Sequence, residues 1–194
     1  KDFDGDASAT TLTINIVDGK PICTDGAHTL DETTDINAII TDVVTATTAT
    51  SFLMGNASGA AEFASSGSLL SGALTSHGVP ITVSLVGGQY IGMAGATQVF
   101  TLSINNSGQY NFVLKAPIDH ASGTNPNDII NLNFAYTAKD ADGDASVGHI
   151  QISVRDDAPF ASADLNTVTD TGTATGNVIT GLNGGAGAAD TLSK

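Results

Sequence analysis

Basic residues are scarce in this chain, which has six lysines and arginines against 20 aspartates and glutamates and a formal net charge of −14. Binding to a nucleic acid or to an anionic membrane surface depends on lysine and arginine, so this balance argues against both partners. A strong negative charge is instead compatible with a protein that binds cations.

Long apolar runs and cysteine pairs are also missing. No stretch approaches the roughly 18 to 20 apolar residues that span a bilayer, so we expect no membrane insertion. The N-terminus lacks the basic leader and apolar core of a signal peptide, and any targeting signal is expected elsewhere in a longer parent chain. The single cysteine, Cys23, excludes an internal disulfide framework, and we expect it to be a small buried residue.

What the chain does have is one acidic motif that occurs twice. KDFDGDAS at residues 1–8 returns as KDADGDAS at residues 139–146, and an ungapped comparison of 1–21 with 139–159 gives ten identical positions. The distance between the copies is that of a whole domain, so the repeat indicates an array of modules. We divide the chain into the tail of a preceding module (1–20), a complete module (21–159) and the head of a following module or linker (160–194).

Each copy of the motif places three aspartates around a glycine. Alternating carboxylates in a turn can direct their oxygens to one point, which suits a hard cation with six to eight oxygen ligands, Ca²⁺ above all. A solvated turn would have a similar composition, but the repetition favours the metal. The predicted Ca²⁺ ligands are Asp2, Asp4 and Asp6 in the first loop and Asp140, Asp142 and Asp144 in the second.

Apolar and polar residues alternate along several segments, with the period of half-buried antiparallel strands. These segments are centred on residues 12–16, 81–85, 100–104, 110–114, 130–136 and 150–154. The NNSG sequence at 105–108 predicts a hairpin, and the second acidic loop joins the last two strands. No segment has a helical stripe and tryptophan is absent. The predicted fold is therefore all-β, a Ca²⁺-stabilised antiparallel β-sandwich with long loops.

Two segments interrupt this pattern. Residues 41–78 are rich in Ala, Ser, Gly and Thr, and they either form weak strands of the same sandwich or build a recognition surface that carries Phe52, Met54 and Phe63. Residues 117–128 (PIDHASGTNPND) suit another Ca²⁺ site, a ligand contact or a solvated loop. The candidate ligand-binding residues in this loop are Asp119, His120, Asn125 and Asp128.

The sequence VFTLSINNSGQYNFVLKAPIDH, followed by an apolar strand, DADGD and HIQISVRDDAP, resembles a repeat found in giant bacterial adhesins exported by type I secretion, the RTX adhesins. The resemblance covers about residues 80–159, and segment 41–78 departs from it. It implies tandem β-sandwich modules that bind several Ca²⁺ ions on the bacterial cell surface. It also implies that some modules near the tip of such an adhesin hold ligands, including peptides.

The ends of the module suggest further cation sites, in an arrangement similar to that of cadherins. Asp156 and Asp157 end one module, and Asp170 lies near the start of the next. The corresponding pair one module earlier is Asp18 with Glu32. A cation that bridged such carboxylates would stiffen the junction, whereas without it their mutual repulsion would loosen the hinge.

These observations leave three functions open. The favoured one is a Ca²⁺-dependent ligand-binding module of an adhesin, which binds an extracellular peptide or protein, or a glycan. The alternative is an extender module whose partners are the neighbouring modules of the same chain. A glycan-active enzyme is a distant third, because the histidines lack metal-ligand spacing and no nucleophile motif is present. We therefore predict that the protein is not an enzyme and has no catalytic residues.

Overall fold

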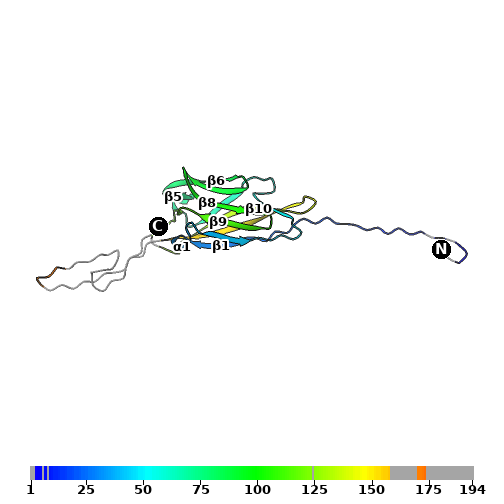
Figure 1. Ribbon diagram of the computed structural model, residues 1–194, viewed down its shortest axis with the longest axis horizontal. Helices are drawn as coiled ribbons and strands as arrows, with labels where there is room; N and C mark the ends of the chain where they lie inside the picture. Colours follow the sequence, from blue (N-terminus) through cyan, green and yellow to red (C-terminus); the bar gives the residue numbers. More distant parts are fainter. Residues whose placement is uncertain (1–2, 6, 8, 124, 158–169, 174–194) are drawn as a thin grey trace.

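The structure is a computed structural model that describes residues 3–5, 7, 9–123, 125–157 and 170–173, and it is a sandwich of two β-sheets (Figure 1). The first sheet contains, in spatial order, β1 (Gly26–Asp31), β11 (Ala145–Arg155), β10 (Ile129–Lys139) and β3 (Ser51–Met54), and β4 (Phe63–Gly67) also pairs with β10. The second sheet contains β2 (Ile39–Val43), β9 (Gln109–Leu114), β8 (Thr97–Ile104), β7 (Gln89–Ala94), β6 (Val79–Val86) and β5 (Thr75–Ser76). The all-β prediction is confirmed.

Among the described residues, helical structure is limited to two short turns, α1 (Glu32–Asp35) and the 3₁₀ turn η1 (Leu70–Gly72). Within the residues that the structure describes, no helix is long and apolar enough to cross a membrane. Cys23 is half-buried, and its thiol lies 3.5 Å from the carbonyl oxygen of Ser146. The fold is thus held together by strand pairing and by the core between the two sheets.

The longest pairing joins β10 and β11, which run antiparallel from Ile129 opposite Arg155 to Lys139 opposite Ala145. The acidic loop closes this hairpin, as the sequence predicts. β1 departs from the expected antiparallel pattern, because it pairs with β11 in parallel, from Gly26 opposite Ile150 to Asp31 opposite Arg155. A parallel pair needs a long connection, and the whole module between β1 and β11 supplies it.

The core lies between the sheets and centres on Phe134 of β10, which is fully buried. Its ring centroid lies 5.2, 5.7 and 6.3 Å from those of Tyr90, Phe100 and Phe112 on the opposite sheet. Phe63 of β4 packs on Phe134 at 5.0 Å. The alternating apolar residues of β8, β9, β10 and β11 supply most of the rest of this core, in agreement with the period-2 prediction.

Segment 41–78 is part of the sandwich. It supplies β3, β4, η1 and β5 and most of β2, and Phe52 and Met54 are buried in the core. Leu53 lies between them and is half-exposed. Segment 41–78 therefore packs as strands of the sandwich, and Phe52 and Met54, although buried, also contribute to the lining of a surface pocket.

Residues 12–16 do not form the strand that their alternation predicts. Leu12 is 82% exposed and Ile16 is 91% exposed, and segment 9–17 extends away from the sandwich (Figure 1). Their counterparts 150–154 in β11 are held between β1 and β10. A strand needs neighbours for its backbone hydrogen bonds, and residues 12–16 have none in the described part of the chain.

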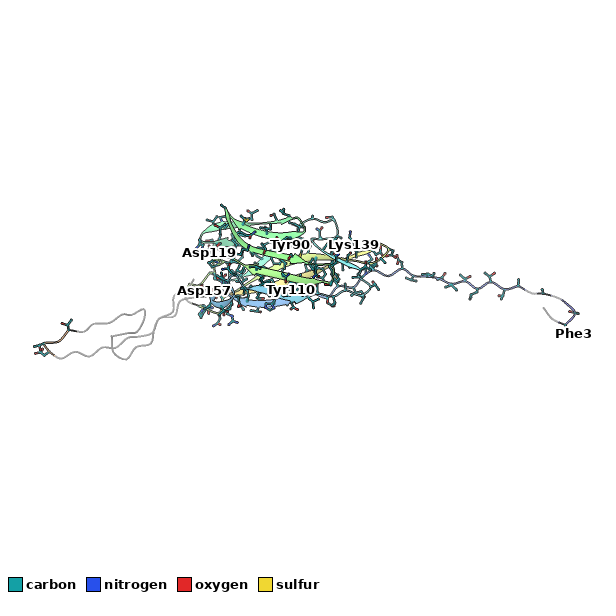
Figure 2. All side chains as sticks on the ribbon, viewed as in Figure 1. Phe3, Tyr90, Tyr110, Asp119, Lys139 and Asp157 are labelled. Carbon is teal, nitrogen blue, oxygen red and sulfur yellow. The ribbon has the colours of Figure 1, made fainter. Side chains whose placement is uncertain are left out.

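The chain enters the sandwich at one end and leaves it at the other. Segment 9–20 joins the end that carries the acidic loop after Lys139, whereas β11 ends beside Asp119 at the opposite end, where Asp157 lies (Figure 2). Residues 18 and 140–144 therefore lie at one end of the module, and residues 32, 119–120 and 156–157 lie at the other.

Gly148 offers a test of the packing between β10 and β11. It lies opposite Tyr136, and a Cβ atom there would stand 2.6 Å from the Tyr136 ring. Tyr136 is buried, and its hydroxyl donates to the carbonyl of Thr24 at 2.7 Å, so the ring has little freedom to move. We expect Gly148→Ala to lower the free energy of unfolding by about 1–3 kcal/mol in urea denaturation. Gly123→Ala is the matched control, because a Cβ there meets nothing within 4 Å; an equal loss in both variants would contradict the prediction.

Candidate functional site

The DADGD loop is a tight turn at the end of the sandwich where the N-terminal segment arrives. The backbone N–H of Asp140 donates to the carbonyl of Asp144 at 3.1 Å, and the N–H of Gly143 donates to the carboxylate of Asp140 at 3.2 Å. Gly143 has a φ of +104°, a conformation that favours glycine. The turn therefore holds its aspartates together at the tip of the β10–β11 hairpin.

Asp18 from the N-terminal segment joins this loop. The negative charge of Asp142 and a hydrogen bond with it raise the pKa of the Asp18 carboxyl. A hydrogen bond with Asp142 likewise raises the pKa of Asp140, and the same bond lowers the pKa of Asp142. These exposed carboxyls offer only oxygen donors and repel one another when ionised, so their chemistry fits Ca²⁺. The loop also lines a shallow surface hollow with Gly19 and Thr48.

The first copy of the motif is only partly described. Asp4 is exposed, and Asp2 and Asp6 lie outside the described residues. The predicted pairing of Asp18 with Glu32 does not form, because Asp18 lies beside Asp142 whereas Glu32 is buried beside Asp156 at the other end of the sandwich. The two carboxylates were assigned to one junction from sequence order, and the fold separates them by the length of the strands.

At that other end, three side chains from separate segments converge. Glu32 follows β1, His120 lies in the loop between β9 and β10, and Asp156 directly follows β11. Each offers one potential ligand atom, and these atoms all lie within 4.8 Å of one another. Glu32, His120 and Asp156 are called the buried triad below.

The triad is enclosed, with exposed fractions of 1% for Glu32, 8% for His120 and 9% for Asp156. One Glu32 oxygen accepts a hydrogen bond from the Ile118 N–H at 2.8 Å, but its Oε2 has no partner, and neither ring nitrogen of His120 has one. Burial raises the pKa of Glu32 to about 8, and the charges of Asp157, Asp156 and Asp119 add to this. Burial also lowers the pKa of His120 and raises that of Asp156.

The other predicted ligand-binding residues of loop 117–128 are engaged within the chain. Asp128 accepts hydrogen bonds from the Ser68 hydroxyl, the Ser122 N–H and the Asn125 amide at 3.1, 2.9 and 2.6 Å. Asp119 accepts from the N–H groups of His77 and Gly78 at 2.8 and 2.7 Å. These bonds favour a supporting role for Asp119, Asn125 and Asp128, which hold the loop that carries His120.

Two predicted junction ligands remain. Asp157 is half-buried next to the triad, and its N–H donates to the carboxylate of Asp156 at 2.9 Å. Asp170 is exposed in a short turn, and the residues on both sides of this turn lie outside the described part of the chain. The structure therefore places Asp156 and Asp157 together and leaves the relation of Asp170 to them as a prediction.

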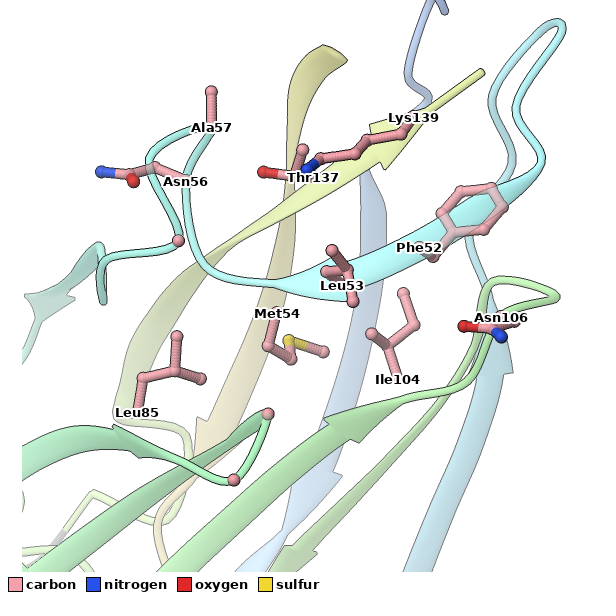
Figure 3. A pocket seen from close by; sticks show the side chains of 13 residues that line it. Phe52, Leu53, Met54, Asn56, Ala57, Leu85, Ile104, Asn106, Thr137 and Lys139 are labelled. Atoms are coloured by element: carbon pink, nitrogen blue, oxygen red, sulfur yellow. The ribbon is translucent and has the colours of Figure 1, made fainter. Parts of the chain in front are cut away.

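A pocket of about 410 Å³ opens on the side of the sandwich near the acidic loop (Figure 3). Leu53 and Met54 of β3, Leu85 of β6 and Ile104 of β8 form its apolar part. Asn56, Asn106, Thr137 and Lys139 supply polar groups, and the Lys139 side chain extends back along β10 towards Thr137. The pocket is thus a concave surface with an apolar wall and one cation.

Comparison with known proteins adds a family. Residues 27–153 match the family described as a domain of unknown function (DUF5801). The chain belongs to the DUF5801 family. No curated protein and no solved structure matches the chain. The matched span contains β1 through most of β11, and so the whole sandwich of this DUF5801 domain.

The sequence predicts a binding role for each residue of the buried triad of the DUF5801 domain. It does not predict that the three side chains lie together. Glu32 and Asp156 were assigned to different junctions, and His120 was assigned to a ligand contact. The signal that links them is the parallel pairing of β1 with β11, in which Asp31 lies opposite Arg155. The next residue of each strand is a triad carboxylate. The alternation of side chains predicts no strand at residues 26–31, so it does not predict this pairing or the cluster that follows from it.

Proposed function

We propose that this DUF5801 domain is a Ca²⁺-binding module of a tandem array in an extracellular bacterial adhesin of the RTX type. The observation that carries the proposal is the position of the repeated acidic motif. The chain enters at the end that holds the DADGD loop and leaves at the opposite end (Figure 2). The copy of this loop at residues 2–6 therefore lies one module back along the chain.

The exposed N-terminal segment supports the same proposal. Residues 12–16 correspond to residues 150–154 of β11, whose apolar side chains are buried between the sheets. Ile14 is 72% exposed and Ile16 is 91% exposed, and such side chains are costly in water. In a tandem array they are the last strand of the preceding sandwich, which buries them.

Ca²⁺ has a defined role in this proposal. Asp140, Asp142 and Asp144 would hold it at the hairpin tip, and Asp18 would contribute from the segment that links two modules. An ion shared by the loop and the linker would fix the direction in which the preceding module projects. The proposed function is therefore to extend the adhesin from the cell surface as a stiff rod, with the neighbouring modules as partners.

Calorimetric titration of the chelator-treated chain with CaCl₂ tests the proposed binding of Ca²⁺ to the acidic loop. We expect Asp142→Asn to weaken Ca²⁺ binding at least ~10-fold, because one of the four carboxylates of the proposed site is lost. Glu62→Gln removes the same charge from an exposed position on the sandwich and serves as the control. Equal affinities in all three proteins would contradict the assignment. For the array, small-angle scattering of a protein with two modules should show a longer particle in Ca²⁺ than in EDTA.

The pocket favours a second function, the binding of an external ligand. Its apolar wall and Lys139 suit a peptide that ends in an apolar side chain and a free carboxylate, and a glycan remains the other ligand class. In this reading the module still stands in the array and adds adhesion to extension.

A peptide and glycan screen in Ca²⁺ addresses this second function. For any ligand of the pocket, we expect Leu53→Asp to weaken binding at least ~10-fold, because a carboxylate replaces apolar contact area. Leu53 is 48% exposed, so the variant should fold. Leu70→Asp is the matched control, since Leu70 is 42% exposed and does not line the pocket. The absence of any bound peptide or glycan would leave extension as the function.

A further inference from the structure

We propose that Glu32, His120 and Asp156 form a binding site for a divalent transition-metal cation, with Zn²⁺ as its representative. This site differs from the Ca²⁺ site of the acidic loop in position, in donors and in burial. All three ligands belong to one module, so the proposal does not depend on the tandem array or on adhesion.

The first argument is the set of unpartnered buried atoms. Oε2 of Glu32 and both ring nitrogens of His120 are buried without a hydrogen-bond partner. Glu32 is only 1% exposed and His120 only 8% exposed. An unpaired buried polar atom destabilises the folded state, so native proteins rarely keep several together. A cation bound between Glu32 and His120 would give these atoms a partner to coordinate.

The second argument is convergence. The three ligand atoms lie within 4.8 Å of one another, and each comes from a different segment of the chain. β1 and β11 hold Glu32 and Asp156 side by side through their parallel pairing. The hydrogen bonds of Asp119 and Asp128 fix the loop that carries His120. The donors are therefore held in place by the fold before a metal arrives.

The third argument is charge. Asp119, Asp128 and Asp157 surround the triad, and each acts on Glu32 or His120 electrostatically. Two further carboxylates belong to the triad itself. Lys and Arg, which would balance this charge, are scarce in the chain, with six in total. A bound divalent cation would neutralise part of this negative charge at a buried site.

The donor types select the class of metal. Ca²⁺ and Mg²⁺ are held by oxygen ligands, whereas an imidazole nitrogen suits zinc and the neighbouring transition metals. Three protein ligands is also the number that open zinc sites use, with water in the fourth position, and both imidazole nitrogen and carboxylate oxygen are zinc ligands. The alternative is that Glu32 carries a proton and the triad binds no metal, and it is one outcome of the test.

The test is calorimetric titration of the chelator-treated full chain with ZnCl₂, and separately with MnCl₂ and CaCl₂. We expect one Zn²⁺ site per chain, bound at least ~10-fold more weakly in His120→Gln and in Glu32→Gln. Glu32→Gln keeps the shape of the side chain, so a folding defect of His120→Gln would not obscure the result. Imidazole nitrogen NMR shifts of the wild type report independently whether His120 binds the metal.

His149→Gln is the matched control. His149 is a half-exposed histidine that also has two carboxylates nearby, Asp25 at 4.0 Å and Glu62 at 3.6 Å. Unchanged Zn²⁺ affinity in this variant supports the buried triad. Loss of Zn²⁺ binding in His149→Gln with retention in His120→Gln would overturn the proposal. So would tighter binding of Ca²⁺ than of Zn²⁺ to the triad, or the absence of metal binding there.

Discussion

Removal of Ca²⁺ with EDTA should lower the melting temperature of the chain by roughly 5–10 °C, if one ion binds the acidic loop at about 100 times its dissociation constant. Such an ion stabilises the folded state by about 2.7 kcal/mol, because the unfolded chain does not hold the carboxylates together. Without the ion, the aspartates of the acidic loop and Asp18 repel one another. The formal charge of −14 adds a general repulsion that favours expansion of the chain.

Thermal unfolding followed by circular dichroism measures this effect. The melting temperature should rise with Ca²⁺ concentration, and Mg²⁺ should substitute poorly because it demands a tight octahedral site and gives up water reluctantly. NaCl at matched ionic strength is the control for simple screening of charge. Equal melting temperatures in EDTA and in millimolar Ca²⁺ would contradict the proposed role of Ca²⁺, and full recovery by NaCl would reduce it to screening.

Alternation of side chains was sufficient to predict five of the strands, which are β6, β8, β9, β10 and β11. Ile130, Leu132 and Phe134 and their partners in β11 point to one face because successive side chains in a strand alternate, and that face is the core. The NNSG hairpin also follows from local chemistry, since the Asn105 side chain accepts from the N–H groups of Ser107 and Gln109 and Gly108 has a φ of +82°. These features depend on neighbours in the sequence, so the sequence reveals them.

Features that depend on distant pairing were not predictable in the same way. Residues 12–16 and 150–154 alternate alike, but only the second set has strands on both sides. Phe52 and Met54 lie in a segment of small residues with weak strand signals. This segment joins the sheet because β3 pairs with β10. The buried triad depends on the parallel partner of β11, a choice that no local pattern encodes.

The second large effect concerns the metal-free protein and the buried carboxyl of Glu32. Burial raises its folded pKa to about 8 from an ordinary value of 4.5. The folded state therefore binds more protons than the unfolded state between these values, and this contribution to stability falls as pH rises from about 4.5 to about 8. Glu32→Gln removes the titration while keeping the side chain's shape. We expect the variant to be more stable than the wild type by on the order of 5 kcal/mol at pH 9 and by less than about 1 kcal/mol at pH 5.

Urea unfolding in a chelating buffer at pH 5, 7 and 9 measures this difference. The other groups that face Glu32, namely His120, Asp119, Asp156 and Asp157, are present in both proteins, so their contributions largely cancel in the comparison. Glu62→Gln is the control, because Glu62 is about half exposed and should change stability little at any of these pH values. A difference between Glu32→Gln and the wild type that stays constant from pH 5 to pH 9 would mean that Glu32 is ionised throughout in the folded chain. If Zn²⁺ is added in place of the chelator, the wild type should become more stable than Glu32→Gln. Only the wild type retains all three metal ligands, and a bound metal favours the ionised carboxylate.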